Sequence, residues 1–245
     1  MVFSRAAWIA GSGLLLSALV ILWIGNATNI DITLADAAFD KATHSFPMQH
    51  AWLAETFNHV ILKKALSALA VFFVALALWD GARPFRRWPD SRRTGLRIVA
   101  MSAVLVPLVI SLAKHESASH CPWDLQRYGG TEPYIRLLEK MPANVSPGHC
   151  MPGGHASSAL WLISIAFFWW PDSRRKAIAV GMMMLLAGVA VGWIQQLRGA
   201  HFLTHTLWSA WIACALVLAI YMTVAKGLAR LPRAGYNSVP AATQT

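Results

Sequence analysis

The sequence contains little charge. Of its 245 residues only 13% are Asp, Glu, Lys or Arg, whereas a soluble domain usually carries about 25%. Hydrophobic residues make up 56%, and they form long blocks rather than the narrow stripe of an amphipathic surface helix. The chain also lacks an internal repeat, a low-complexity tract and a separate soluble domain. These shortages argue against a soluble enzyme and indicate a protein whose solvent is lipid.

Six apolar blocks are candidate transmembrane helices. They lie near residues 7–25, 61–79, 98–113, 156–170, 177–194 and 206–225. A span needs about 20 apolar residues, so the third and fourth blocks must borrow flanking residues or lie where a site dips into the membrane. The first block resembles a signal peptide, but no small-residue cleavage site clearly follows it, so we expect a retained helix. The predicted fold is an all-α, polytopic membrane domain over residues 1–234, followed by a disordered tail at 235–245.

Acidic residues are scarce, and the basic excess is unevenly placed. With the N-terminus in the cytoplasm, the inward segments are Arg5, residues 81–97, residues 171–176 and the tail after Lys226. Together with Asp80 and Lys226 at their borders, these segments hold 13 of the 21 Lys and Arg and three acids, so they carry the whole net charge of +10. The positive-inside rule therefore predicts that both termini are cytoplasmic. This topology, with attraction to anionic headgroups, explains the charge without a nucleic-acid partner.

All nine histidines fall on the outer side of this topology. They are His44, His50, His59, His115, His120, His149, His155, His201 and His205. Three outer stretches, which begin at Lys114, Cys150 and Gln195, also hold the other polar groups that are unusual in a membrane protein. We therefore look for a functional site on this side.

The chain has only three cysteines. Cys214 lies in the middle of the last block, where a small apolar role is expected. Cys121 and Cys150 share the outer loop, residues 114–155, and thiols outside a bacterial inner membrane tend to oxidise. We predict a disulfide between them, which would restrict the unfolded loop by roughly 3–4 kcal/mol. The alternative is two free thiols that never meet.

The stretch Pro152–His155 immediately precedes an apolar helix. Glycines at a helix start, here Gly153 and Gly154, let the backbone approach a ligand closely, and free N–H groups there bind anions. His155 could donate a proton at the same place. The alternative is an ordinary helix entry after a turn.

Arg198, His201 and His205 have helical spacing and share one face if the segment is helical. Histidines four apart also occur in zinc-protease helices, but Phe202 stands where those helices carry Glu. Zinc bound by His155, His201 and His205 is therefore kept as an alternative. Lys114 places a positive charge at the edge of the third block. A charge beside a membrane span is energetically unfavourable unless it has a function. The alternative is a lysine that simply extends its ammonium group to the membrane interface.

Together these stretches resemble the type-2 phosphatidic acid phosphatase superfamily of membrane lipid phosphatases. Lys114, six residues and Cys121-Pro122 resemble the first family motif, with Cys in place of Arg. Pro152–His155 resembles the second motif, with Gly153 in place of Ser. Residues 199–201 match the core of the third motif. Order, spacing and the six-helix frame agree over nearly the whole chain.

Two arginines of the family pattern have no counterpart at their usual places. Cys121 and Gln195 stand there instead. Arg127 is a candidate to replace the first arginine, because it follows Cys121 closely in the outer loop. Arg198 is a candidate for the second, because it lies one helical turn from Gln195.

The resemblance implies a two-step phosphoryl transfer that needs no metal and no other cofactor. His201 would form a phosphohistidine, and His155 would protonate the leaving oxygen and then help to activate water. His205 stands where the family has an orienting aspartate, and Asp124 or Glu116 is a candidate to supply that charge. The groups expected to bind phosphate are Lys114, Arg127, Arg198, Gly153 and Gly154.

The expected function is an integral membrane phosphatase that acts on a lipid phosphate or diphosphate monoester. Its site would lie at headgroup level on the periplasmic face of a bacterial inner membrane. A lipid phosphotransferase would use the same residues. A non-catalytic lipid-binding relative fits the altered motifs, and a zinc transporter or zinc hydrolase would use the outer histidines.

Overall fold

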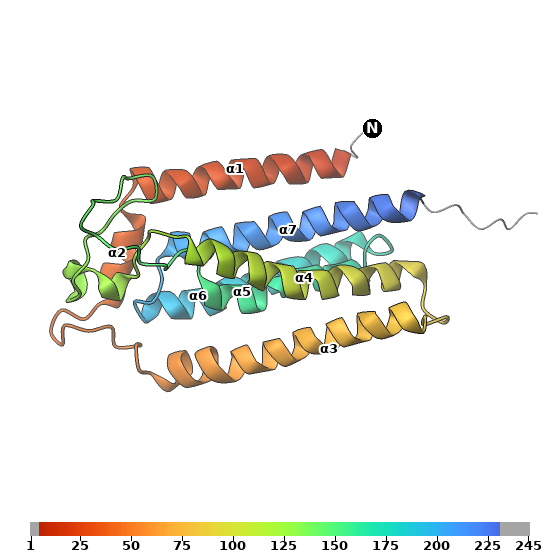
Figure 1. The fold of residues 1–245 in the computed structure, drawn as a ribbon, viewed down its shortest axis with the longest axis horizontal. Coiled ribbons are helices and arrows are strands. Elements are labelled where there is room, and N and C mark those ends of the chain that lie inside the picture. The colour runs from red at the N-terminus through yellow and green to blue at the C-terminus, as the bar shows by residue number, and fades with distance from the viewer. Residues whose placement is uncertain (1–4, 231–245) are drawn as a thin grey trace, which may run out of the picture.

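The computed structural model describes residues 5–230 (Figure 1). Within these residues, every element of regular secondary structure is a helix. The α-helices are α1 Arg5–Ala27, α2 Ile30–Ala38, α3 Lys63–Ala82, α4 Asp90–His115, α5 Gly154–Leu160, α6 Arg174–Leu197 and α7 Leu203–Arg230. A π-helix, Leu53–Leu62, runs into α3, and a 3-10 helix, Trp161–Phe168, continues α5. Two short 3-10 helices, Pro122–Asp124 and Gln126–Tyr128, lie in the outer loop. The predicted all-α class is confirmed, whereas the tail predicted at 235–245 lies outside the described residues.

Five helical stretches are long and apolar enough to cross a membrane. They are Trp8–Ala27, Leu53–Ala82, Asp90–His115, Arg174–Leu197 and Leu203–Val224. The block predicted near 156–170 is also helical, but this apolar helix, Gly154–Phe168, is shorter. Length and composition thus support five of the six predicted spans and a multi-pass membrane protein. The orientation of the spans stays a prediction.

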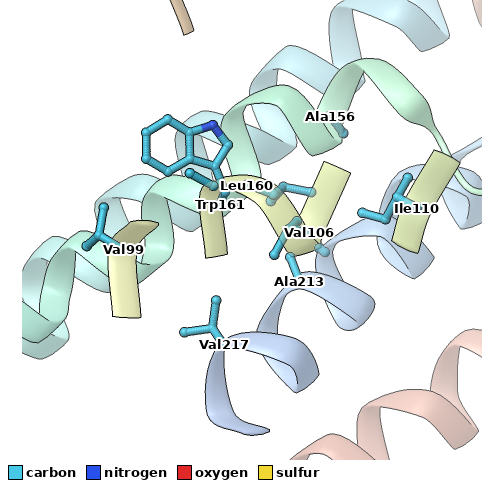
Figure 2. Packing of buried hydrophobic residues seen from close by; sticks show 10 residues of the cluster. Val99, Val106, Ile110, Ala156, Leu160, Trp161, Ala213 and Val217 are labelled. Carbon is cyan, nitrogen blue, oxygen red and sulfur yellow. The ribbon is translucent and has the colours of Figure 1, made fainter. Parts of the chain in front are cut away.

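The core lies where α4, α5 with its 3-10 continuation, and α7 meet (Figure 2). Val106 and Ile110 of α4 pack with Leu160, Trp161 and, from α7, Val217. In a bilayer such packing stabilises mainly through dispersion and shape, because lipid tails are as apolar as the side chains. Outside this core, α1 and α3 flank the bundle and expose large apolar side chains, as lipid-facing helices do (Figure 1).

Two glycines shape the junction of α6 and α7. A Cβ at Gly192 would overlap the side chain of Thr206, so the absence of a side chain lets these helices approach closely there. Gly199 has φ +74°, a conformation that L-residues rarely adopt. The N–H of Ala200 donates to the Gln195 carbonyl at 3.0 Å, and the chain then turns into α7. This turn determines where the third motif lies.

The histidine-rich stretches share one end of the bundle. In Figure 1, α2 and the outer loop lie at the end where α4 stops and α5 and α7 start. The connection at residues 83–89, which contains three arginines, and the basic start of α6 lie at the opposite end. The separation of histidines from basic loops that hydropathy predicts is therefore present in the fold.

Candidate functional site

His201 and His205 lie at the junction of α6 and α7. Because Gly199 ends the helical run, His201 sits in the turn between the helices, and only His205 is helical. The imidazole centroids are nevertheless 5.7 Å apart, with ring planes inclined by 67°. Each residue is only 3% exposed. The turn thus brings the two rings together inside the protein.

The second motif is fastened to α7 by hydrogen bonds. The Gly153 N–H donates to the His205 carbonyl at 3.0 Å, and the Ser209 hydroxyl donates to the Gly153 carbonyl at 3.0 Å. This attachment places the ring centroid of His155 6.0 Å from that of His201. The N–H of Gly153, predicted to bind phosphate, is therefore already donated within the protein.

His59 belongs to this cluster, although the sequence analysis did not single it out. It lies on the π-helix that precedes α3, and its Nδ1 is hydrogen-bonded to Nε2 of His155. The two ring centroids are 4.4 Å apart. The one sequence feature that could have identified His59 was its position four residues before Lys63, which lies at the start of the second apolar block. The cluster is therefore larger than the motifs indicate.

A cavity of about 480 Å³ opens beside the pair of His59 and His155, between α3, α4 and α5. Lys63 and Lys114 both line it, as does Gly154, and no lining residue is acidic. Its walls further along the helices are mainly apolar and comprise Leu66, Ala70, Ala103, Pro107 and Trp161. Such a cavity attracts an anion at its cationic end and accommodates hydrocarbon along the rest.

Arg198 is buried near the same histidines. Its Nε donates to the carbonyl of Gln49 at 3.1 Å, and its Nη1 donates to Oε1 of Gln195 at 3.1 Å. Its charge acts on the imidazole of His155, as do the charges of Lys63 and Lys114. The structure thus brings two of the three cations predicted to bind phosphate close to the histidines.

Arg127, the third of those cations, is directed elsewhere. It lies in the short helix Gln126–Tyr128, and its Nε and Nη2 donate to the two carboxylate oxygens of Asp36 at 2.7 and 2.6 Å. The Arg127 guanidinium holds the pKa of Asp36 below its usual range. Tyr128 donates to the same carboxylate at 2.9 Å. Arg127 therefore fastens the outer loop to α2 rather than pointing at the histidines.

The predicted disulfide between Cys121 and Cys150 is present, with Cα atoms 5.4 Å apart. The Cys150 sulfur lies 3.4 Å from Nδ1 of His201 and 3.2 Å from the carbonyl oxygen of Ala200. Cys150 is fully buried. The cross-link therefore closes the outer loop directly beside His201.

The surroundings of His201 keep its ring neutral. Burial lowers the pKa of His201 well below its ordinary value, and the charges of His205, Lys114 and His155 act in the same direction. A hydrogen bond to the backbone of Cys150 raises the pKa, as a carbonyl acceptor does for a ring N–H. Nδ1 is the nitrogen that faces Cys150. We therefore assign the proton to Nδ1 and the free lone pair to Nε2.

The two carboxylates considered for orienting His201 are engaged elsewhere. Glu116 lies 3.3 Å from Nδ1 of His115, and Asp124 accepts the backbone N–H of Cys121 at 3.3 Å. Neither is directed at His201. The groups beside the His201 ring are instead the sulfur and the backbone of Cys150.

One compact group of potential metal ligands occurs among residues 5–230. It comprises Cys121, Cys150 and His201, whose ligand atoms lie within 4.8 Å of one another. The two sulfur atoms are joined in the disulfide, so they are not the thiolates that bind metals. The alternative zinc set of His155, His201 and His205 does not form a group of this compactness in the described chain.

The fold and the site define a multi-pass membrane protein with buried histidines and cations beside a partly apolar cavity. Residues 95–228, more than half of the chain, match the family model of the PAP2 superfamily. The chain therefore belongs to the PAP2 superfamily, as the motifs predicted, and members of this superfamily are generally membrane-associated phosphatases. Comparisons with curated proteins and with solved structures gave no match.

Proposed function

We propose that the protein hydrolyses a lipid phosphate or diphosphate monoester at the periplasmic face of a bacterial inner membrane, through a phosphohistidine on His201. One observation carries this proposal. A cavity that is cationic at one end and mainly apolar along its length adjoins His155, whose ring lies next to the buried, neutral ring of His201. A headgroup phosphate would meet the cations, and the lipid chain would lie along the apolar wall.

In the first step, Nε2 of His201 attacks phosphorus, and the bond from phosphorus to the leaving oxygen breaks. The backbone of Cys150 holds Nδ1–H and keeps the ring in place while positive charge develops on it. His155, which His59 contacts, gives a proton to the leaving oxygen. In the second step, water attacks the phosphohistidine, the P–N bond breaks, and His155 takes a proton from the water. These steps use neither a metal nor another cofactor.

Positioned cations neutralise the phosphate oxygens in this scheme. Lys63 and Lys114 line the cavity, and the charge of Arg198 acts on His155. The N–H of Gly154 is the backbone donor at the start of α5. Charges fixed in a site of low dielectric stabilise a transition state by several kcal/mol because they need no reorganisation. Arg127 is not part of this set, because its guanidinium is hydrogen-bonded to the carboxylate of Asp36.

The test uses the purified full-length protein in lipid nanodiscs with a chelator present. Phosphate release is measured from phosphatidic acid, phosphatidylglycerol phosphate, a prenyl diphosphate and a lipid A phosphate. His201→Ala should abolish release, whereas His115→Ala, which changes an exposed outer histidine, should not. Labelled phosphate should be trapped on the wild type as an acid-labile, base-stable adduct.

Full activity of His201→Ala on every lipid would overturn the assignment of the nucleophile. Transfer of phosphate to a lipid acceptor without free phosphate would identify a phosphotransferase instead. Loss of all activity with chelator, restored by zinc, would favour the zinc alternative.

A further inference from the structure

A second, much smaller cavity adjoins His205. Its volume is about 20 Å³, which is space for one water molecule, or at most two. Its polar lining comprises Asp31, Ser119, His120, Tyr134, Thr204 and His205. None of its lining residues also lines the large cavity beside His155, so the two are separate.

Two imidazoles of this lining each have a buried nitrogen without a hydrogen-bond partner. These atoms are Nδ1 of His120 and Nδ1 of His205. The two residues are 7% and 3% exposed. Buried polar atoms are nearly always hydrogen-bonded, either to protein or to ordered water. Two such nitrogens around one water-sized cavity therefore indicate a water molecule as their shared partner.

Asp31 supplies a negative charge to the same cavity. The residue is 4% exposed, and its carboxylate accepts the backbone N–H of Thr204 at 3.0 Å and the Thr204 hydroxyl at 2.5 Å. The pKa of Asp31 is raised by burial, and hydrogen bonds from these two donors and the positive charge of Arg136 limit that rise. A carboxylate oxygen has a second lone pair, so Asp31 can also accept a hydrogen from water.

The tautomer of His120 fixes the direction of these hydrogen bonds. Nε2 of His120 donates to the carbonyl of Ser146 at 2.8 Å, so Nδ1 of the neutral ring is an acceptor. A water that donates one hydrogen to Asp31 and the other to His120 has only lone pairs left. It must then accept a hydrogen from Nδ1 of His205.

We propose that this cavity is a buried water site through which the Asp31 carboxylate fixes the tautomer of His205. His205 then carries its proton on Nδ1 and its lone pair on Nε2, next to the ring of His201. Asp31 lies on α2, outside residues 95–228, and it is a positioning residue because it acts through the water and His205. Its effect on catalysis rests on the proposed phosphatase function, whereas the water and the tautomer do not.

Asp31→Asn tests the proposal because it keeps the shape of the side chain but removes its charge. The new amide N–H₂ donates a hydrogen bond to the water, whereas the carboxylate accepts one from it. The water then donates that hydrogen to His205 instead, so Nδ1 of His205 becomes an acceptor. Thr204→Val is the matched control, because it removes the hydroxyl contact to Asp31 but leaves the carboxylate. Nitrogen-15 NMR of histidine-labelled, full-length protein in nanodiscs reads each tautomer, and the His205→Gln spectrum assigns the signal.

We expect His205 to be protonated at Nδ1 in the wild type and in Thr204→Val, and at Nε2 in Asp31→Asn. In the phosphatase assay, Asp31→Asn should lower kcat at least tenfold with little change in KM, as loss of an outer partner of a site histidine does, whereas Thr204→Val should not. A wild-type His205 protonated at Nε2, or a tautomer unchanged in Asp31→Asn, would overturn the proposal. An inactive wild type with the expected tautomers would support the water site and overturn only the phosphatase function.

Discussion

Replacing both disulfide cysteines with alanine tests whether the cross-link beside His201 matters for the chemistry. The bridge joins residues 29 apart in the sequence. In the chain-entropy model, closing a loop of that length restricts the unfolded chain by roughly 3–4 kcal/mol. We expect the Cys121→Ala/Cys150→Ala protein to lose stability of this order, which would appear as a lower midpoint of thermal unfolding.

The larger effect should be on kcat. Cys150 provides both the sulfur 3.4 Å from Nδ1 of His201 and the backbone group that holds the ring. Once the cross-link is gone, the segment that carries this group is tied down by fewer bonds. A misplacement of about 1 Å at a reacting group costs about 100-fold in rate, so we expect kcat to fall roughly 10- to 100-fold. KM should change less, because Lys63 and Lys114 lie on helices that the disulfide does not join.

Phosphate release would be measured below the unfolding midpoint of the variant. Cys214→Ala is the matched control, because it removes a free thiol from α7 without removing a cross-link. Reduction of the wild type with a dithiol should reproduce the loss of activity, and reoxidation should restore it. A folded double variant with wild-type kcat would refute the reasoning that the cross-linked segment positions His201.

Substitutions of Lys114 and Arg127 test which cations bind the phosphate. Lys114→Gln should lower kcat/KM roughly 10- to 100-fold, because the phosphate loses a fixed charge, whereas Lys64→Gln, which changes an exposed lysine outside the cavity lining, should leave it unchanged. Arg127→Ala should leave kcat within about twofold and lower stability by at most about 1 kcal/mol, because its ion pair with Asp36 is partly exposed, with side-chain exposures of 54% and 32%. Since that pair lowers the pKa of Asp36, its contribution should be present above pH 3.8 and fade below it in acid-unfolding curves. A large loss of kcat in Arg127→Ala would return this arginine to the site.

The sequence predicted which residues share one end of the molecule, because the order of apolar blocks determines which loops lie on the same side. Lys114, His155, His201 and the disulfide all follow from that order. The contacts within that end depend on loop conformation, which hydropathy does not encode. Arg127 shows this difference, because its partner Asp36 lies 91 residues away on a short helix with no motif around it.

The limits of the helices were harder to predict than their existence. The second apolar block was expected near residue 61, but its helix starts at Leu53, so His59 is helical and faces His155. Polar residues such as Glu55 and Asn58 break the hydropathy signal without breaking the helix. At the third motif, Gly199 interrupts the helical spacing that seemed to join Arg198 to His205. The rings still meet, because the tight turn replaces the expected helical turn.

The segment that matches the family begins at residue 95, within α4, so part of the proposed site lies outside that segment. Asp31, His59 and Lys63 all lie before it, and the helix Leu53–Ala82 forms one wall of the large cavity. A fragment that starts at residue 95 would keep every motif residue but would lack that wall. The first helices are therefore more than a membrane anchor. Efforts to change which lipid chain is accepted should begin with Leu66 and Ala70, on the part of the protein that the family motifs leave out.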